Sequence, residues 1–144
     1  MMDLDHSQDL SVDVEKTRAY YENENADDYC DCSACINYRK RSASVYPEIA
    51  AYLSQFGIDI AKPFHLSYLM PENGLLKYIN CFYVAFGSMG SDWHKEIGNV
   101  DIYAGTHYPD PHVEEPFIVF EIWQIDVPYS DEDAKIGKRT WFME

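Results

Sequence analysis

The sequence predicts an α+β fold, namely a mainly antiparallel sheet of about four strands with N-terminal helices packed on one side. Helical signals concentrate before the Lys62–Pro63 pair, and alternating apolar segments follow it. Turn-forming residues, not further helices, separate those later segments. Helices first and consecutive strands afterwards are typical of an antiparallel sheet that is covered by helices on one face.

Two helices are expected ahead of the sheet. The first covers residues 32–43, and the second begins at Pro47, whose missing N–H has no helical partner in a first turn. Gly57 is expected to end the second helix as a left-handed cap. Residues 13–29 fit neither the helical nor the strand period. The apolar stripe of the second helix has the spacing i, i+3, i+4, i+7 and consists of Ile49, Tyr52, Leu53 and Phe56.

Four strands are expected after the helices, at residues 64–70, 75–86, 100–108 and 117–127. The second and the fourth are apolar on both faces over part of their length, which is typical of central strands. Between the first two strands, Asn73 and Gly74 tolerate the positive φ of a tight turn. Residues 87–99 are expected to form a long loop.

The chain has 144 residues, which suits one domain that can bury a core without disulfides or metal. We expect a flexible acidic start at residues 1–12 and a single α+β domain at residues 13–144. The formal net charge is −14. This charge argues against binding to nucleic acid or to an anionic membrane, and it is compatible with a basic protein partner.

The N-terminus lacks the basic start and the apolar stretch of a signal peptide, and no apolar run is long enough to span a bilayer. A cytoplasmic location is therefore expected, where thiols stay reduced. Neither the oligomeric state nor an enzymatic activity follows from these observations.

Three cysteines lie within one short segment, Cys30, Cys32 and Cys35, and the fourth, Cys81, lies far along the chain. Cys-x-Cys and Cys-x-x-Cys spacings let thiolates converge on one tetrahedral ion, so the cluster is predicted to hold a structural zinc ion. Cys81 is the expected fourth ligand, with His65 and His94 as substitutes. A lone cysteine in an apolar strand is, however, more often a small core residue.

Two other interpretations of the cysteines remain open. In the first, Cys32 and Cys35 form a redox-active pair, in which a helix N-terminus and Arg39 stabilise a thiolate. The surroundings lack the βαβ pattern that is expected of a thioredoxin-like motif. In the second, the thiols are buried beside the helix and only pack.

One further resemblance rests on three motifs. They are the segment C-x-C-x-x-C-x-N, which ends at Asn37, the Tyr46-Pro47-Glu48 helix start, and the G-I-D-x-x-K-P stretch from Gly57 to Pro63. Together they resemble an uncharacterised family of small bacterial proteins, over roughly residues 20–90. The resemblance implies a bacterial cytosolic protein and no particular enzymatic activity.

A binding role is predicted for the glycine-containing segment 87–99, where Trp93 and His94 would form one lip of a cleft. The alternative is that Trp93 folds back into the core. The function expected first is a small cytosolic binding or interaction domain whose cysteine cluster holds zinc. A thiol-dependent redox protein or enzyme and an acidic, immunity-type inhibitor of a basic protein are the alternatives.

Overall fold

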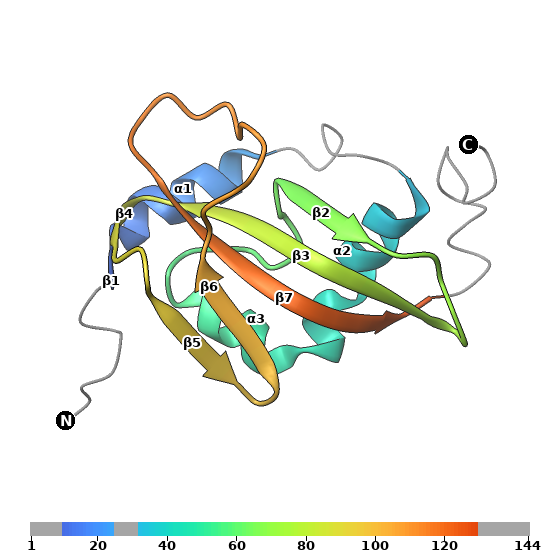
Figure 1. Ribbon diagram of the computed structural model, residues 1–144. Helices are drawn as coiled ribbons and strands as arrows, with labels where there is room; N and C mark the ends of the chain where they lie inside the picture. The colour runs from blue at the N-terminus through green and yellow to red at the C-terminus, as the bar shows by residue number, and fades with distance from the viewer. Residues whose placement is uncertain (1–9, 25–31, 130–144) are drawn as a thin grey trace.

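The computed structural model describes residues 10–24 and 32–129, and their arrangement confirms the α+β class. The main sheet is antiparallel and contains five strands: β2 (His65–Tyr68), β3 (Leu75–Ala85), β5 (His94–Ile97), β6 (Val100–Ala104) and β7 (Ile118–Pro128). Their spatial order is β2-β3-β7-β6-β5 (Figure 1). A second, two-stranded sheet pairs β1 (Leu10–Val12) with β4 (Gly87–Met89).

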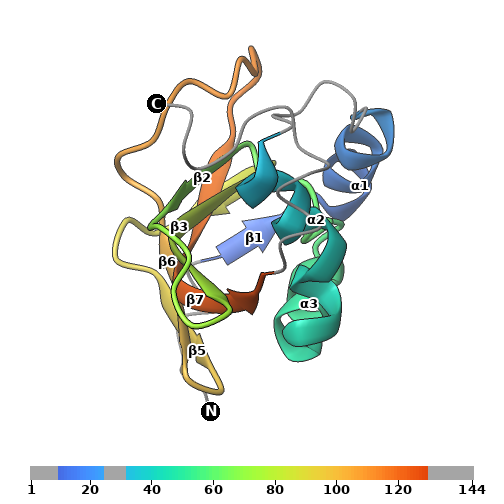
Figure 2. The same ribbon diagram turned by 90° about the vertical axis from the view of Figure 1, so that its right-hand side faces the viewer.

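Three helices lie on one face of the main sheet (Figure 2): α1 (Val14–Asn23), α2 (Ser33–Val45) and α3 (Pro47–Ser54). The core fills the space between this layer and the sheet. Among the described residues, no helix covers the opposite face, which is called the outer face below. None of the three helices has the length and apolar character that a membrane span requires.

The strands β3 and β7 form the centre of the sheet, as their apolar sequences predict. They pair antiparallel from Leu75 opposite Pro128 to Ala85 opposite Ile118, with one irregularity at Gln124, whose φ is +54°. The expected tight turn before β3 is also confirmed, since Asn73 has φ +56° and Gly74 has φ +77°.

The expected second helix is confirmed as α3, with Pro47 in its first turn. Ile49 and Leu53 are buried, and Gly57 has φ +87°. The Ile58 N–H donates to the Leu53 carbonyl oxygen at 3.1 Å, as in a Schellman cap. Gly57 also lies against α1, because a Cβ atom built there would be 2.7 Å from the backbone nitrogen of Arg18.

Sequence periodicity did not find α1. The helix begins after Asp13, whose side chain accepts a hydrogen bond from the Lys16 N–H at 3.1 Å. Only Thr17 and Tyr21 of this helix are buried, so its sequence lacks an apolar stripe. The last three residues of the expected flexible start, Leu10–Val12, form β1.

The prediction of a long loop at residues 87–99 is wrong, because this segment contains β4 and β5. Both strands are short and polar, with exposed or half-buried side chains. Their extended form depends on pairing with β1 and β6, which local alternation in the sequence does not reveal. The main sheet therefore has five strands, where about four were expected.

Two glycine substitutions test the packing of α1 on the end of α3. Gly57→Ala is expected to lower the free energy of unfolding by about 2–4 kcal/mol, because it adds a backbone clash to the strain of a positive φ. Gly74→Ala is the matched control, since its φ is similar and nothing lies within 4 Å of the added Cβ. We expect it to cost only about 1 kcal/mol in urea-unfolding measurements. Equal losses would contradict the close approach of α1 at Gly57.

Candidate functional site

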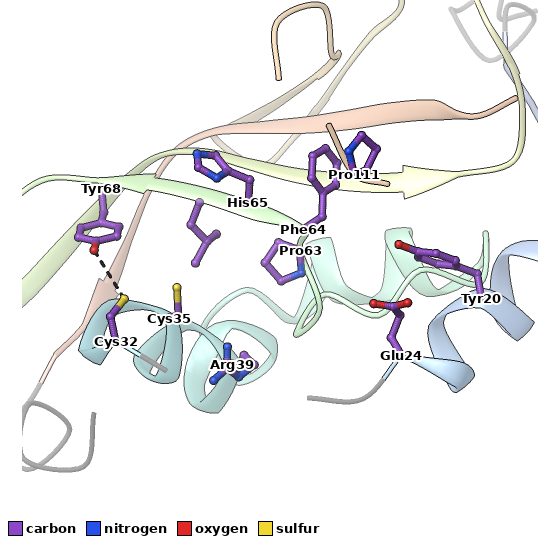
Figure 3. A pocket seen from close by; sticks show the side chains of 11 residues that line it. Tyr20, Glu24, Cys32, Cys35, Arg39, Pro63, Phe64, His65, Tyr68 and Pro111 are labelled. Carbon is purple, nitrogen blue, oxygen red and sulfur yellow. Dashed lines mark hydrogen bonds between the residues drawn. The ribbon is translucent and has the colours of Figure 1, made fainter. Parts of the chain in front are cut away.

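A cavity of about 410 Å³ opens between the end of α1, the first turns of α2, strand β2 and the connection between β6 and β7 (Figure 3). Its size falls within the range of small-ligand pockets. We call it the thiol pocket. Its lining consists of Tyr20, Glu24, Cys32, Cys35, Arg39, Pro63, Phe64, His65, Leu66, Tyr68 and Pro111.

Helix α2 brings two thiols to this pocket. Cys32 is the N-cap residue of α2, and Cys35 lies in its first turn, so the two side chains share one side of the helix. Figure 3 shows both sulfur atoms pointing toward β2. The Sγ of Cys32 is 3.6 Å from the hydroxyl oxygen of Tyr68, and neither cysteine is in a disulfide. Cys32 is buried, whereas Cys35 is half-buried.

Three further polar groups of the pocket come from α1 and α2. Arg39, one turn after Cys35, lines the pocket on the side of α2. Tyr20 and Glu24 line it at the end of α1. Burial, together with the negative charge of Glu24, raises the pKa of Tyr20 to about 12, so this phenol is neutral at physiological pH. The pocket therefore combines two soft sulfur donors with one cationic group and one anionic group.

His65 does not face the thiols, although it borders the pocket. Its ring lies on the other side of β2 from the sulfur atoms (Figure 3), next to Phe82 on the outer face. Partial burial lowers the pKa of this imidazole, which favours its neutral form. Leu66, the neighbouring residue, occupies the inner side of β2 and is buried in the core.

Cys81, the expected fourth ligand, lies on β3 opposite Leu66 and is fully buried. Its surroundings are those of a core residue, because it belongs to the buried cluster between the helices and the sheet. Burial raises the pKa of the Cys81 thiol to about 12, and a hydrogen bond with Tyr38 partly opposes that rise. A thiol in this environment stays protonated at neutral pH.

Of the four predicted cysteine ligands, the described residues contain Cys32, Cys35 and Cys81, and these three do not gather around one point. Within residues 10–24 and 32–129, no three metal-ligating side chains gather closely enough to hold an ion. Cys30 lies outside the described residues. Cys32 and Cys35 are the two expected ligands that the structure does bring together.

Trp93 and His94 occupy different environments. Trp93 is 2% exposed and packs edge-to-face on Phe120, with ring centroids 5.4 Å apart, so it forms part of the core. His94 begins β5 and lies on the outer face, where its Nε2 is 2.8 Å from Oδ1 of Asp101. The two side chains therefore do not form a common lip.

Sequence reasoning missed a second group of polar side chains, on the outer face. Glu121 lies between apolar residues of β7, and its carboxylate bonds the side chains of Asn80 and Trp123. The sequence signal for this group is an acidic residue, Glu121, inside an otherwise apolar central strand. The partners of Glu121 are set by strand pairing between distant parts of the chain, which the sequence does not show.

Comparison with known proteins adds no relative: no known family matches the chain, and neither a curated protein nor a solved structure is significantly similar to it. The resemblance to a family of small bacterial proteins stays a prediction. Any functional conclusion must therefore come from the geometry of the two sites.

Alkaline unfolding distinguishes a core cysteine from a ligand at position 81. An unfolded Cys81 ionises near the ordinary thiol pKa of 9.0, whereas burial raises the pKa of the folded thiol to about 12. The unfolded state thus binds fewer protons in this window, so stability should fall as pH rises above 9. The slope contributed by Cys81 approaches about 1.4 kcal/mol per pH unit.

The control is Cys81→Ala, which removes this contribution and keeps every other titrating group. We expect its urea-unfolding free energy to fall less steeply than that of the unmodified chain between about pH 9 and 10, although the variant starts lower because of a small cavity. Parallel curves for the two proteins would show that Cys81 is not buried as a protonated thiol.

Proposed function

We propose that this chain is a small cytoplasmic binding domain whose thiol pocket captures a soft metal ion through Cys32 and Cys35. The observation that carries the proposal is the convergence of both sulfur atoms on one pocket at the start of α2. Thiolate ligands favour soft or borderline ions such as Cu(I) and Zn²⁺. Cys30, two residues before Cys32, is proposed as a third thiolate, and Cys81 has no part in the site.

The surroundings of the thiols support this proposal. Cys32 occupies the N-cap position of α2, where the helix dipole favours negative charge on a sulfur atom. Arg39 lines the same pocket and adds positive charge beside the pair. The hydroxyl of Tyr68 reaches Cys32 Sγ at 3.6 Å and so contacts the first ligand from the opposite wall. Such contacts around a ligand help to orient it toward an ion.

Cadmium titration of the reduced chain tests the proposal, because cadmium–thiolate bonds give an ultraviolet charge-transfer band. We expect the band to appear in the unmodified chain and to weaken in Cys32→Ser and in Cys35→Ser, each of which removes one of the converging sulfur atoms. Competition with a chelator should show that affinity falls by about 10–100-fold for either variant.

Cys81→Ala is the matched control, since it removes a thiol that lies in the core. It should keep both the band and the affinity. Loss of the band in Cys81→Ala, or its absence from the unmodified chain, would contradict the proposed site.

A second candidate function is a dithiol redox protein, which the N-cap position of Cys32 favours. In that reaction, one thiolate attacks a substrate disulfide and the other then displaces the substrate as a dithiol, which leaves a Cys32–Cys35 disulfide. Incubation with a disulfide such as oxidised glutathione distinguishes the two functions. Rapid, reversible formation of that disulfide, without a cadmium band in the reduced protein, would favour the redox function.

A further inference from the structure

The outer face of the sheet carries a cluster of polar and aromatic side chains that the thiol pocket does not involve. Cross-strand pairing places them side by side: Asn80 and Asp101 each lie opposite Trp123, and Tyr103 lies opposite both Glu121 and His94. We call this group the outer-face cluster. It consists of Asn80, His94, Asp101, Tyr103, Glu121 and Trp123.

Glu121 is the central and most buried member of the cluster, at 8% exposed. Its Oε2 accepts hydrogen bonds from Asn80 Nδ2 at 2.7 Å and from Trp123 Nε1 at 2.8 Å. Both donors are neutral, and among the described residues no Lys, Arg or His forms an ion pair with this carboxylate. A carboxylate withdrawn from water without a cation is costly, so this position favours binding of an external cation.

An aromatic platform borders the carboxylate. Trp123 is 41% exposed, which is unusual for a tryptophan in a central strand. Its ring centroid lies 4.9 Å from that of Tyr103, and Tyr103 stacks on His94 at 4.5 Å. Flat aromatic faces beside a carboxylate suit a cation that is itself planar, because such a cation can stack and bond at the same time.

Asp101 supplies a second carboxylate at the same place. Its Oδ1 is 2.8 Å from His94 Nε2, and its side chain is 41% exposed. It lies opposite Trp123 on the neighbouring strand. The two carboxylates thus flank the exposed indole, since Glu121 is bonded to the indole nitrogen.

We propose that the outer-face cluster is a docking site for an arginine side chain of a basic partner protein. The guanidinium would stack on the exposed Trp123 ring and bond the carboxylates of Glu121 and Asp101. Charge complementarity supports a basic protein as the occupant, because the chain has a formal net charge of −14. Arginine fits better than lysine, since its planar group both stacks and forms paired hydrogen bonds.

The test uses the full chain and a capped peptide of alternating glycine and arginine, with glycine–lysine and glycine–glutamate peptides alongside. In a nitrogen-15 NMR titration, the indole N–H signal of Trp123 should shift with the arginine peptide, whereas that of the buried Trp93 should stay in place. The lysine peptide should bind more weakly, and the glutamate peptide should cause no shift.

Two variants locate the binding. Glu121→Gln keeps an acceptor for Asn80 and Trp123 but removes the charge, and Trp123→Ala removes the platform. Each should weaken binding of the arginine peptide by about tenfold. Glu22→Gln is the charge-matched control, because Glu22 is exposed on α1, on the helical side of the molecule. It should weaken binding by less than about twofold.

An equal loss in Glu22→Gln and Glu121→Gln would show that the peptide responds only to net charge, and it would overturn the proposal. A Trp123 indole signal that stays unmoved in the unmodified chain at saturating arginine peptide would overturn it as well, whether or not the variants fold. Failure of this test leaves the thiol pocket unaffected, because the two sites share no residue.

Discussion

A layer of buried tyrosine hydroxyls joins the helices to the sheet, and the position of the thiol pocket depends on it. Three of these phenols are fully or almost fully buried, and each donates a hydrogen bond at 2.6 Å to a backbone carbonyl: Tyr21 to Val84, Tyr78 to Ala34 and Tyr83 to Ile60. Tyr38 in turn bonds the hydroxyl of Tyr83. Because an unsatisfied buried hydroxyl costs about 1–3 kcal/mol, these bonds restrict where α1 and α2 can lie on the sheet.

The helices that these tyrosines hold cover one face of β3 and β7, and within the described residues they leave the other face open. Tyr78 bonds the carbonyl of Ala34, which lies between Cys32 and Cys35, so β3 holds the thiol-bearing turn of α2 against the sheet. With this inner face closed by helices, the strands leave their other side chains on the outer face. There Glu121 and Trp123 project from β7, away from the buried Ile122. One sheet thus separates a site of soft sulfur chemistry from an acidic, aromatic surface.

The sequence reveals those elements whose signals are local. Residues 75–86 and 117–127 are recognisable as central strands from their apolar composition, and α3 from Pro47 and Gly57. The elements that it hides depend on distant partners: α1 buries only two side chains, and β5 is extended because β6 pairs with it. The neighbours of Glu121 cannot be predicted from spacing, because they arise from strand register. The apolar strand around Cys81, in contrast, already indicates a core cysteine.

The claim that the tyrosine layer positions the thiol pocket is tested most directly by the alkylation rate of Cys32 in Tyr78→Phe. Loss of the hydroxyl frees the first turn of α2, so the buried Cys32 should react about tenfold faster with iodoacetamide at neutral pH. Tyr46→Phe is the matched control. Tyr46 is the N-cap residue of α3, and its hydroxyl donates to the carbonyl oxygen of Asp126 on β7 and not to the thiol-bearing turn. It should leave the rate unchanged. Equal rates in Tyr78→Phe and the unmodified chain would contradict the claim.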